Sequence, residues 1–176
     1  MCDVMYDERT DVITFDGNPL TLVGDEVQVG QKAPNFDILA NDLSSVKLSD
    51  TAGKVRILSV VPSLDTPVCD TQTRTFNQHA ASLGADVEIL TISADLPFAQ
   101  GRWCGAAGVD QVTTLSDHRE VSFGTGYGLL IKELRLLTRA LLVIDREGII
   151  QYIQIVSELT NEPNYDEALE AARKLV

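Results

Sequence analysis

Residues 55–69 read VRILSVVPSLDTPVC, an apolar run followed at once by a proline-bounded segment and a cysteine. The run at 55–61 is rich in β-branched residues, which predicts a buried central strand. Pro67 suits the first position of a helix, because its missing N–H would be unpaired there. Thr66 is held extended by the proline after it and is the predicted N-cap. Cys69 therefore falls in the first turn of a helix.

The rest of the chain alternates strands with helices. Alternating residues at 12–15 and 20–23, with Asp16 and Gly17 between them, predict an N-terminal β-hairpin. Apolar runs and helical periodicity predict strands at 87–93, 140–145 and 149–156, and helices at 67–83, 97–107, 119–127 and 165–175, the last capped by Asn164. This order predicts one α/β domain over residues 1–176, with a mixed central sheet and flanking helices, of which about 1–30 form the hairpin extension.

Charge and hydropathy exclude several classes of protein. The chain has 14 basic against 26 acidic residues, a net charge of −12. Nucleic acids and anionic membrane surfaces both need a basic footprint, so neither is an expected partner. The most apolar stretch, 140–156, is interrupted by charged residues and falls short of the roughly 20 residues of a membrane span. The acidic N-terminal segment lacks the apolar core of a secretory signal, which predicts a cytoplasmic protein.

The cysteines are Cys2, Cys69 and Cys104, and no two of them form a CxxC pair. His79 and His118 do not lie near paired cysteines, so no metal site and no cofactor is expected. In a chain without a secretory signal, these cysteines indicate reactivity more than structural bridging. Cys2 is predicted to have no role.

Cys69 has the setting of a nucleophile. Free N–H groups and the positive end of the helix dipole favour a thiolate, which is the reactive form. Asp70 opposes this effect, so a nearby cation is needed, and Arg139 at the start of the 140–145 strand is the preferred candidate. The alternative is a buried structural cysteine, since free cysteines are often buried. The strand-to-helix junction favours the functional interpretation, because α/β proteins bind ligands at that edge of the sheet.

Cys104 follows the 87–93 strand by a short distance. If this strand is parallel to the 55–61 strand, both cysteines emerge at the same edge of the sheet. A disulfide between them needs Cα atoms within about 7 Å. If both cysteines start out helical, one helix must partly unwind. The alternative is a core cysteine beside Trp103.

Two segments resemble a known family. Pro62, Thr66 and Cys69 have the spacing P-x-x-x-T-x-x-C of the peroxiredoxin active site, and the sequence SLDTPVC at 63–69 resembles the thiol peroxidase subfamily in particular. The sequence ISADLPFAQGRWCG at 92–105 is similar to the segment that carries the resolving cysteine of that subfamily. The resemblance runs nearly end to end. It implies a thioredoxin-like fold with an N-terminal β-hairpin, and usually a homodimer.

The resemblance also implies roles. Cys69 matches the peroxidatic cysteine, which hydrogen peroxide and organic hydroperoxides oxidise to a sulfenic acid. Thr66 matches the residue that orients the peroxide, and Pro62 matches the proline that shields the pocket from water. Arg139 matches the arginine that stabilises the thiolate and the polarised peroxide. Cys104 matches the resolving cysteine, whose disulfide with Cys69 is reduced by thioredoxin.

Two residues depart from the family pattern. Trp103 stands where phenylalanine is expected, and Asp70 where a small residue is expected. A bulkier ring at 103 is expected to change how easily the helix of Cys104 unwinds. Neither departure falls on a matched catalytic position.

Two other functions are compatible with the same cysteines. One is a redox-sensing or chaperone-like protein that uses the disulfide as a switch with little turnover. The other is a thiol–disulfide oxidoreductase that acts on proteins. The absence of a CxxC pair argues against the second.

Overall fold

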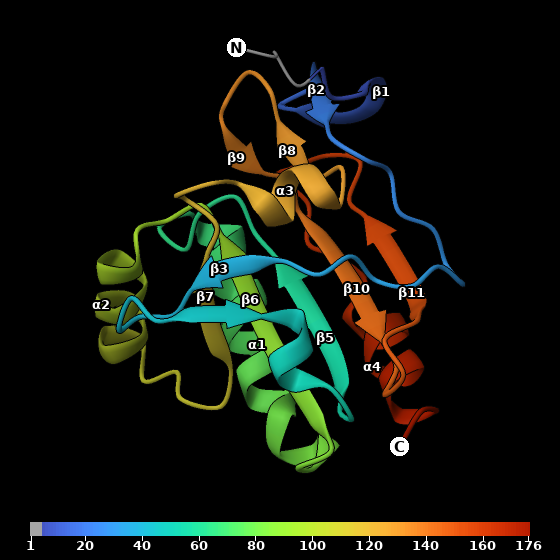
Figure 1. Ribbon diagram of the computed structural model, residues 1–176. Coiled ribbons are helices and arrows are strands. Elements are labelled where there is room, and N and C mark those ends of the chain that lie inside the picture. Colours follow the sequence, from blue (N-terminus) through green and yellow to red (C-terminus); the bar gives the residue numbers. More distant parts are fainter. Residues whose placement is uncertain (1–4) are drawn as a thin grey trace.

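The computed structural model describes residues 5–176 and is built on a seven-stranded mixed sheet (Figure 1). In sheet order its strands are β11 (Ile150–Ile155), β10 (Ala140–Ile144), β5 (Val55–Val60), β6 (Val87–Ser93), β7 (Thr113–Ser116), β3 (Asp37–Leu39) and β4 (Ser45–Lys47). Strands β5, β6 and β7 run parallel, and the outer strands pair antiparallel to their neighbours. The predicted mixed α/β sheet is confirmed. Cys2 lies outside the described residues.

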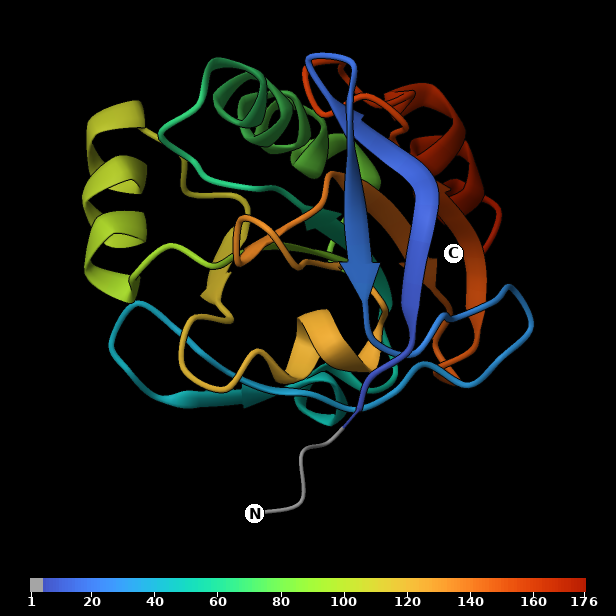
Figure 2. The same cartoon turned by 90° about the horizontal axis from the view of Figure 1, so that it is seen from above.

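Helices cover both faces of this sheet (Figure 2). Helices α1 (Pro67–Leu83) and α4 (Tyr165–Arg173) lie on one face, α3 (Ser122–Gly126) lies on the other, and α2 (Pro97–Ala107) packs beside β7. The side chains of β5 alternate between the two layers: Ile57 packs into the apolar cluster that holds Phe76, whereas Leu58 packs into the one that holds Phe123. Burial on both faces explains why the central strands are continuous apolar runs in the sequence.

A smaller sheet carries the N-terminal hairpin. Its order is β1 (Glu8–Phe15), β2 (Asn18–Val23), β8 (Leu130–Ile131) and β9 (Leu136–Leu137). Asp16 and Gly17 form the turn between β1 and β2, with φ angles of 48° and 78°. Positive φ at both central residues is what a tight two-residue hairpin turn requires. The predicted hairpin is confirmed.

Glu158 attaches this hairpin to the loop after β11. Its carboxylate accepts hydrogen bonds from the Thr14 hydroxyl at 2.6 Å and from the backbone N–H groups of Asp16 and Gly17 at 3.0 and 3.1 Å. Hydrogen bonds from the Thr14 hydroxyl, the Gly17 N–H and the N–H and hydroxyl of Thr160 lower the pKa of Glu158 to about 2. The next residue, Leu159, donates its backbone N–H to the Thr14 carbonyl at 2.9 Å. The hairpin therefore fixes the position of the Leu159 backbone.

The structure corrects part of the sequence prediction. The helix expected at 119–127 starts only at Ser122 and ends at Gly126, because Val121 adopts a left-handed conformation with φ of 53°. The last helix ends at Arg173 and not at 175, although Asn164 caps it as predicted. The short strands β3, β4, β7, β8 and β9 and the single-turn 3-10 helix η1 (Leu48–Thr51) were not predicted.

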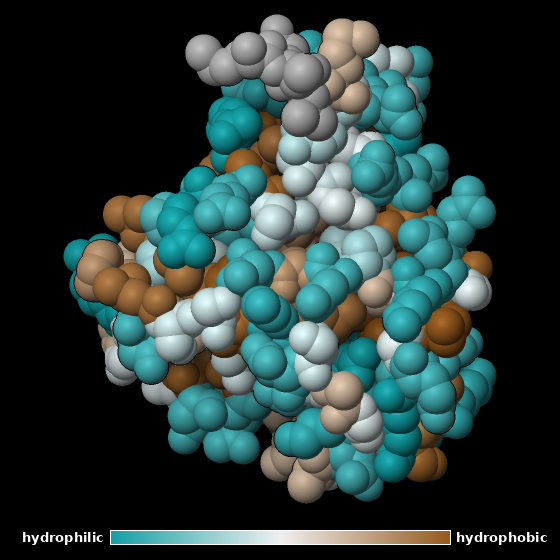
Figure 3. Space-filling model, viewed as in Figure 1, coloured by the Kyte–Doolittle hydropathy of each residue, from teal (hydrophilic) through white to brown (hydrophobic). Residues whose placement is uncertain are grey.

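Hydrophilic side chains cover much of the face seen in Figure 3, with apolar patches toward the side where α2 lies. A hydrophilic exterior agrees with the net charge of −12. Within residues 5–176, no helix combines the length and the apolar character that crossing a bilayer requires.

The start of α3 generates a prediction about pH. Burial raises the pKa of Asp117 from 3.8 to about 6. Its carboxylate accepts hydrogen bonds from the backbone N–H groups of Gly124 and Phe123, which lower the pKa and offset part of this rise. Between these two values the folded chain binds more protons than the unfolded chain, so the contribution of Asp117 to stability falls as pH rises through this window. Carbon-13 NMR of the aspartate carboxyl groups should show one titration near pH 6 that disappears in Asp117→Asn. A midpoint below 4 for Asp117 would contradict the prediction.

Candidate active site

The junction between β5 and α1 places Cys69 where the sequence predicts it. Thr66 is extended, with φ of −102° and ψ of 146°, and Pro67 is the first residue of the helix. The Thr66 hydroxyl does not cap the helix but donates to the Ser63 carbonyl at 2.9 Å. Cys69 lies two residues into α1 and is fully buried. The N-terminal turn therefore presents its free N–H groups and positive dipole end near a sulfur shielded from water.

A carboxylate from the neighbouring strand holds the loop before Cys69. Asp95, just after β6, accepts hydrogen bonds from the Ser63 hydroxyl at 2.7 Å and from the Leu64 backbone N–H at 2.8 Å. Its second oxygen also accepts from the Ser93 hydroxyl at 2.8 Å. Pro62 is buried in the same loop. This loop is thus fixed to the end of β6 and not free to move independently.

Arg139 reaches Cys69 because of the register of the sheet. Strand β10 runs antiparallel to β5 with Ala140 opposite Val60, so the residue before β10 lies at the end of the sheet where β5 finishes. The Nη1 atom of Arg139 lies 3.4 Å from the Cys69 sulfur. The predicted cation is therefore in contact with Cys69, and at 2% exposure it is itself buried.

The other contacts of Arg139 are neutral. Its Nη1 donates to the Gln72 side-chain oxygen at 3.0 Å, and its Nε and Nη2 donate to the Leu159 carbonyl at 3.1 and 2.9 Å. Within the described part of the chain, none of the ion pairs to a carboxylate includes Arg139. A buried guanidinium without a counter-charge is costly by several kcal/mol. A thiolate at Cys69 would supply that charge at hydrogen-bond distance.

Three residues of this site were not identified from the sequence. Gln72 shares the face of α1 that carries Cys69, and its amide nitrogen donates to the Ser59 hydroxyl at 2.8 Å. Asp95 lies two residues after a predicted strand, so its place at the carboxyl edge could have indicated a role. Leu159 contributes only its backbone carbonyl, which leaves no mark in the sequence.

Cys104 lies in α2 but does not face Cys69. Its sulfur lies 3.5 Å from the Thr114 hydroxyl, and it lines a shallow cavity with Asn41. Trp103, the preceding residue, packs instead against the apolar cluster that contains Cys69. Both thiols are free and both residues are helical. The parallel pairing of β5 and β6 is confirmed. Both cysteines are helical, which is the case for which the sequence predicts that one helix must partly unwind before a disulfide forms.

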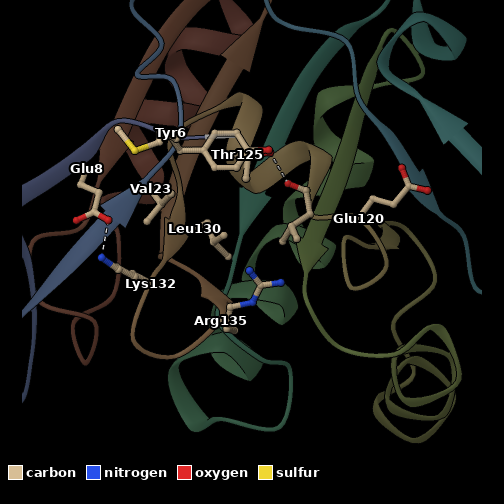
Figure 4. Close-up of a pocket in the computed structure, with 10 residues that line it drawn as sticks. Tyr6, Glu8, Val23, Glu120, Thr125, Leu130, Lys132 and Arg135 are labelled. Carbon is tan, nitrogen blue, oxygen red and sulfur yellow. Dashed lines mark hydrogen bonds and ion pairs between the residues drawn. The ribbon is translucent and has the colours of Figure 1, made fainter. Parts of the chain in front are cut away.

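A well-defined cavity lies away from the cysteines. It has a volume of about 690 Å³ and opens between the N-terminal hairpin and α3 (Figure 4). Its wall combines apolar side chains such as Val23 and Leu130 with the cations Lys132 and Arg135, and Lys132 pairs with Glu8. Among the described residues, none of the predicted site residues lines it. This cavity is therefore separate from the site around Cys69.

Comparison with known proteins decides the family. The family described as Redoxin matches residues 28–169. A thiol peroxidase from Halalkalibacterium halodurans is 62% identical over 161 residues, which cover 92% of this chain and 96% of that protein. The chain belongs to the thiol peroxidases of the redoxin family. A second thiol peroxidase, from Bacillus subtilis, is 60% identical over 93% of this chain and 98% of its own length.

Solved structures of the family agree with the fold. A peroxiredoxin-like protein from Aquifex aeolicus superimposes with a TM-score of 0.89 at 40% identity, covering 97% of this chain and 99% of that one. A thiol peroxidase from Chromobacterium violaceum has the same fold, with a TM-score of 0.81 at 16% identity over 92% of this chain and 95% of that one. As a member of the thiol peroxidases, the chain has the thioredoxin-like architecture that its sequence predicted.

The contact between Arg139 and Cys69 yields a prediction. Replacing Arg139 by alanine removes the buried cation, so the reaction with peroxide that the sequence predicts for Cys69 should slow by about a hundredfold or more, as when one preorganised donor is lost from an active site. Stopped-flow measurement of sulfenic acid formation tests this. Arg139→Lys is the matched control: it keeps the charge but not the forked donor to Leu159, and should recover only part of the rate. An unchanged rate in Arg139→Ala would show that Arg139 does not assist the reaction of Cys69.

Proposed function

We propose that this chain reduces hydrogen peroxide and organic hydroperoxides, using Cys69 as the nucleophile. The observation that carries the proposal is the contact between Cys69 and Arg139, a buried guanidinium with no carboxylate partner in the described chain. A thiolate in a water-poor site beside a fixed cation can attack a neutral peroxide, and the cation can stabilise the charge that develops on the leaving oxygen. Membership in the thiol peroxidases supports this chemistry.

The first step breaks the O–O bond. The Cys69 thiolate attacks one peroxide oxygen, forming an S–O bond, while the other oxygen leaves and takes up a proton as water or an alcohol. The sulfur of Cys69 is oxidised to a sulfenic acid, whereas the peroxide is reduced. Arg139 is proposed to hold both the thiolate and the departing oxygen with its fixed N–H donors, because it is anchored by the Leu159 carbonyl.

Thr66 and Pro62 are proposed to prepare the peroxide for this attack. Thr66 is an exposed residue at the start of α1, and its hydroxyl donates to the Ser63 carbonyl in this structure. It would then orient the peroxide by a hydrogen bond. Pro62 is buried and offers no backbone donor, which suits a residue that keeps water from the sulfenic acid.

In the second step Cys104 resolves the sulfenic acid. Its thiol attacks the Cys69 sulfur, the S–S bond forms, and the sulfenic oxygen leaves as water with the thiol proton. A dithiol of the thioredoxin type then reduces the disulfide and is itself oxidised. Because the Cys104 sulfur contacts Thr114 in the reduced chain, this step needs a rearrangement of α2.

The remaining expectations accompany the mechanism. The chain is proposed to work as one domain, as a homodimer and in the cytoplasm, with thioredoxin as its reductant. The resemblance to the thiol peroxidases supports the homodimer and the reductant. Neither a metal nor an organic cofactor is needed, since the electrons come from thiols.

The graded effect of cysteine replacement tests the proposal. In an assay that couples peroxide consumption to thioredoxin, thioredoxin reductase and NADPH, the wild-type chain should turn over continuously. Cys69→Ser should abolish consumption. Cys104→Ser should allow one oxidation and then stop, leaving Cys69 open to over-oxidation to the sulfinic acid.

Two controls separate this function from the alternatives. Cys2→Ser should turn over like the wild type, because Cys2 has no proposed role. A single stoichiometric burst without recycling by the wild type would favour the redox sensor instead. Reduction of insulin at the rate of a dithiol oxidoreductase would favour the thiol–disulfide oxidoreductase that acts on proteins.

A further inference from the structure

Helices α1 and α2 are joined by three side chains, Asp70, Arg74 and Trp103, which we call the interhelical cluster. The indole N–H of Trp103 donates to one oxygen of Asp70 at 3.0 Å. The Nε of Arg74 donates to the other oxygen at 2.8 Å. The guanidinium of Arg74 also lies over the Trp103 ring, 5.6 Å from its centroid. Each member therefore contacts the other two, and both oxygens of Asp70 are satisfied.

Arg74 makes a second attachment to α2. Its Nη1 donates to the carbonyl of Ala107, the last residue of that helix, at 3.1 Å. A cation at a helix C-terminus satisfies a free carbonyl and opposes the helix dipole. Cys104 lies between the two attachment points, Trp103 and Ala107. The part of α2 that carries Cys104 is thus fastened to α1 on both sides of this cysteine.

The cluster adjoins the reacting sulfur. Asp70 directly follows Cys69, and the Trp103 ring packs against the apolar cluster of Val61, Leu64 and Cys69. Because Cys104 points to Thr114 while Trp103 occupies the side facing Cys69, the Trp103 ring must be displaced when α2 unwinds. That displacement breaks the Trp103–Asp70 hydrogen bond and removes the Arg74 stacking contact.

We propose that Asp70, Arg74 and Trp103 are positioning residues that set the rate at which Cys104 closes on oxidised Cys69. The cluster holds α2 folded while Cys69 is reduced, and its breakage is part of the barrier to disulfide formation. This inference rests on the proposed peroxidase function and concerns its second step. The step itself forms the S–S bond and releases the sulfenic oxygen as water, and the cluster takes no part in the electron transfer.

The two ends of the Trp103–Asp70 hydrogen bond can be removed separately. Trp103→Phe keeps an aromatic ring but loses the N–H donor, and Asp70→Ala removes the acceptor while keeping a good helix former. The Trp103–Asp70 hydrogen bond involves a charged group, and its loss should lower the barrier to disulfide closure. Closure should therefore be about tenfold faster in either variant. The double variant should be no faster than about the faster single variant, because both changes remove the same bond.

The chain offers a direct signal for this step. Trp103 is the single tryptophan, so its fluorescence in stopped-flow mixing with peroxide reports on α2 in the wild type and in Asp70→Ala. The phase that depends on peroxide concentration measures Cys69 oxidation, and the phase that does not measures disulfide closure. For Trp103→Phe, acid quench and mass spectrometry follow the same disulfide. Glu170→Gln, which removes the Lys174–Glu170 ion pair in α4, is the matched control and should change neither phase.

The outcomes distinguish the role of the interhelical cluster from the peroxidase function on which it rests. Faster disulfide closure in both Trp103→Phe and Asp70→Ala, with less sulfinic acid on Cys69 at high peroxide, supports the proposal that the interhelical cluster slows disulfide formation. Closure at the wild-type rate, or slower closure, in both folded variants would overturn this role while leaving the peroxidase function intact. Absence of any oxidation of Cys69 in the wild-type chain would overturn the peroxidase function itself.

Discussion

The buried guanidinium of Arg139 is the constraint on which the site depends. A charge at 2% exposure must be hydrogen-bonded and balanced, and the neutral acceptors Gln72 and Leu159 supply only the hydrogen bonds. The sulfur of Cys69 at 3.4 Å is the group that can supply the opposite charge. In the proposed reaction the same contact also holds the nucleophile, so the burial of Arg139 and the chemistry proposed for Cys69 depend on one interaction.

Much of the fold acts to hold this pair together. Antiparallel pairing of β10 with β5 brings residue 139 to the end of the sheet where α1 begins. Glu158 attaches the N-terminal hairpin to the loop whose Leu159 carbonyl anchors the guanidinium. Asp95 fixes the loop before Cys69 from the opposite side. A hairpin distant in sequence thus contributes to the placement of the buried guanidinium of Arg139.

Local signals and long-range contacts differ in how well the sequence predicts them. The strand at 87–93 and the helix at 67–83 were predicted with their observed bounds, because apolar runs and the Pro67 start signal are local. The short strands β8 and β9 were missed, since two-residue strands are defined by their partners and not by their composition. Cys69 and Arg139 were identified, whereas the acceptor carbonyl of Leu159 was not, because a backbone atom has no residue signature. The residues that depart from the family pattern, Asp70 and Trp103, proved to contact one another.

In the proposed function, the contact with Arg139 makes Cys69 the sulfur that peroxide oxidises. Mass spectrometry of the fully reduced chain after one equivalent of hydrogen peroxide measures which cysteine is oxidised. Oxidation should fall on Cys69, because among the described cysteines its sulfur contacts the buried guanidinium. Oxidation confined to Cys2, with Cys69 left reduced, would show that this contact does not select the reacting sulfur.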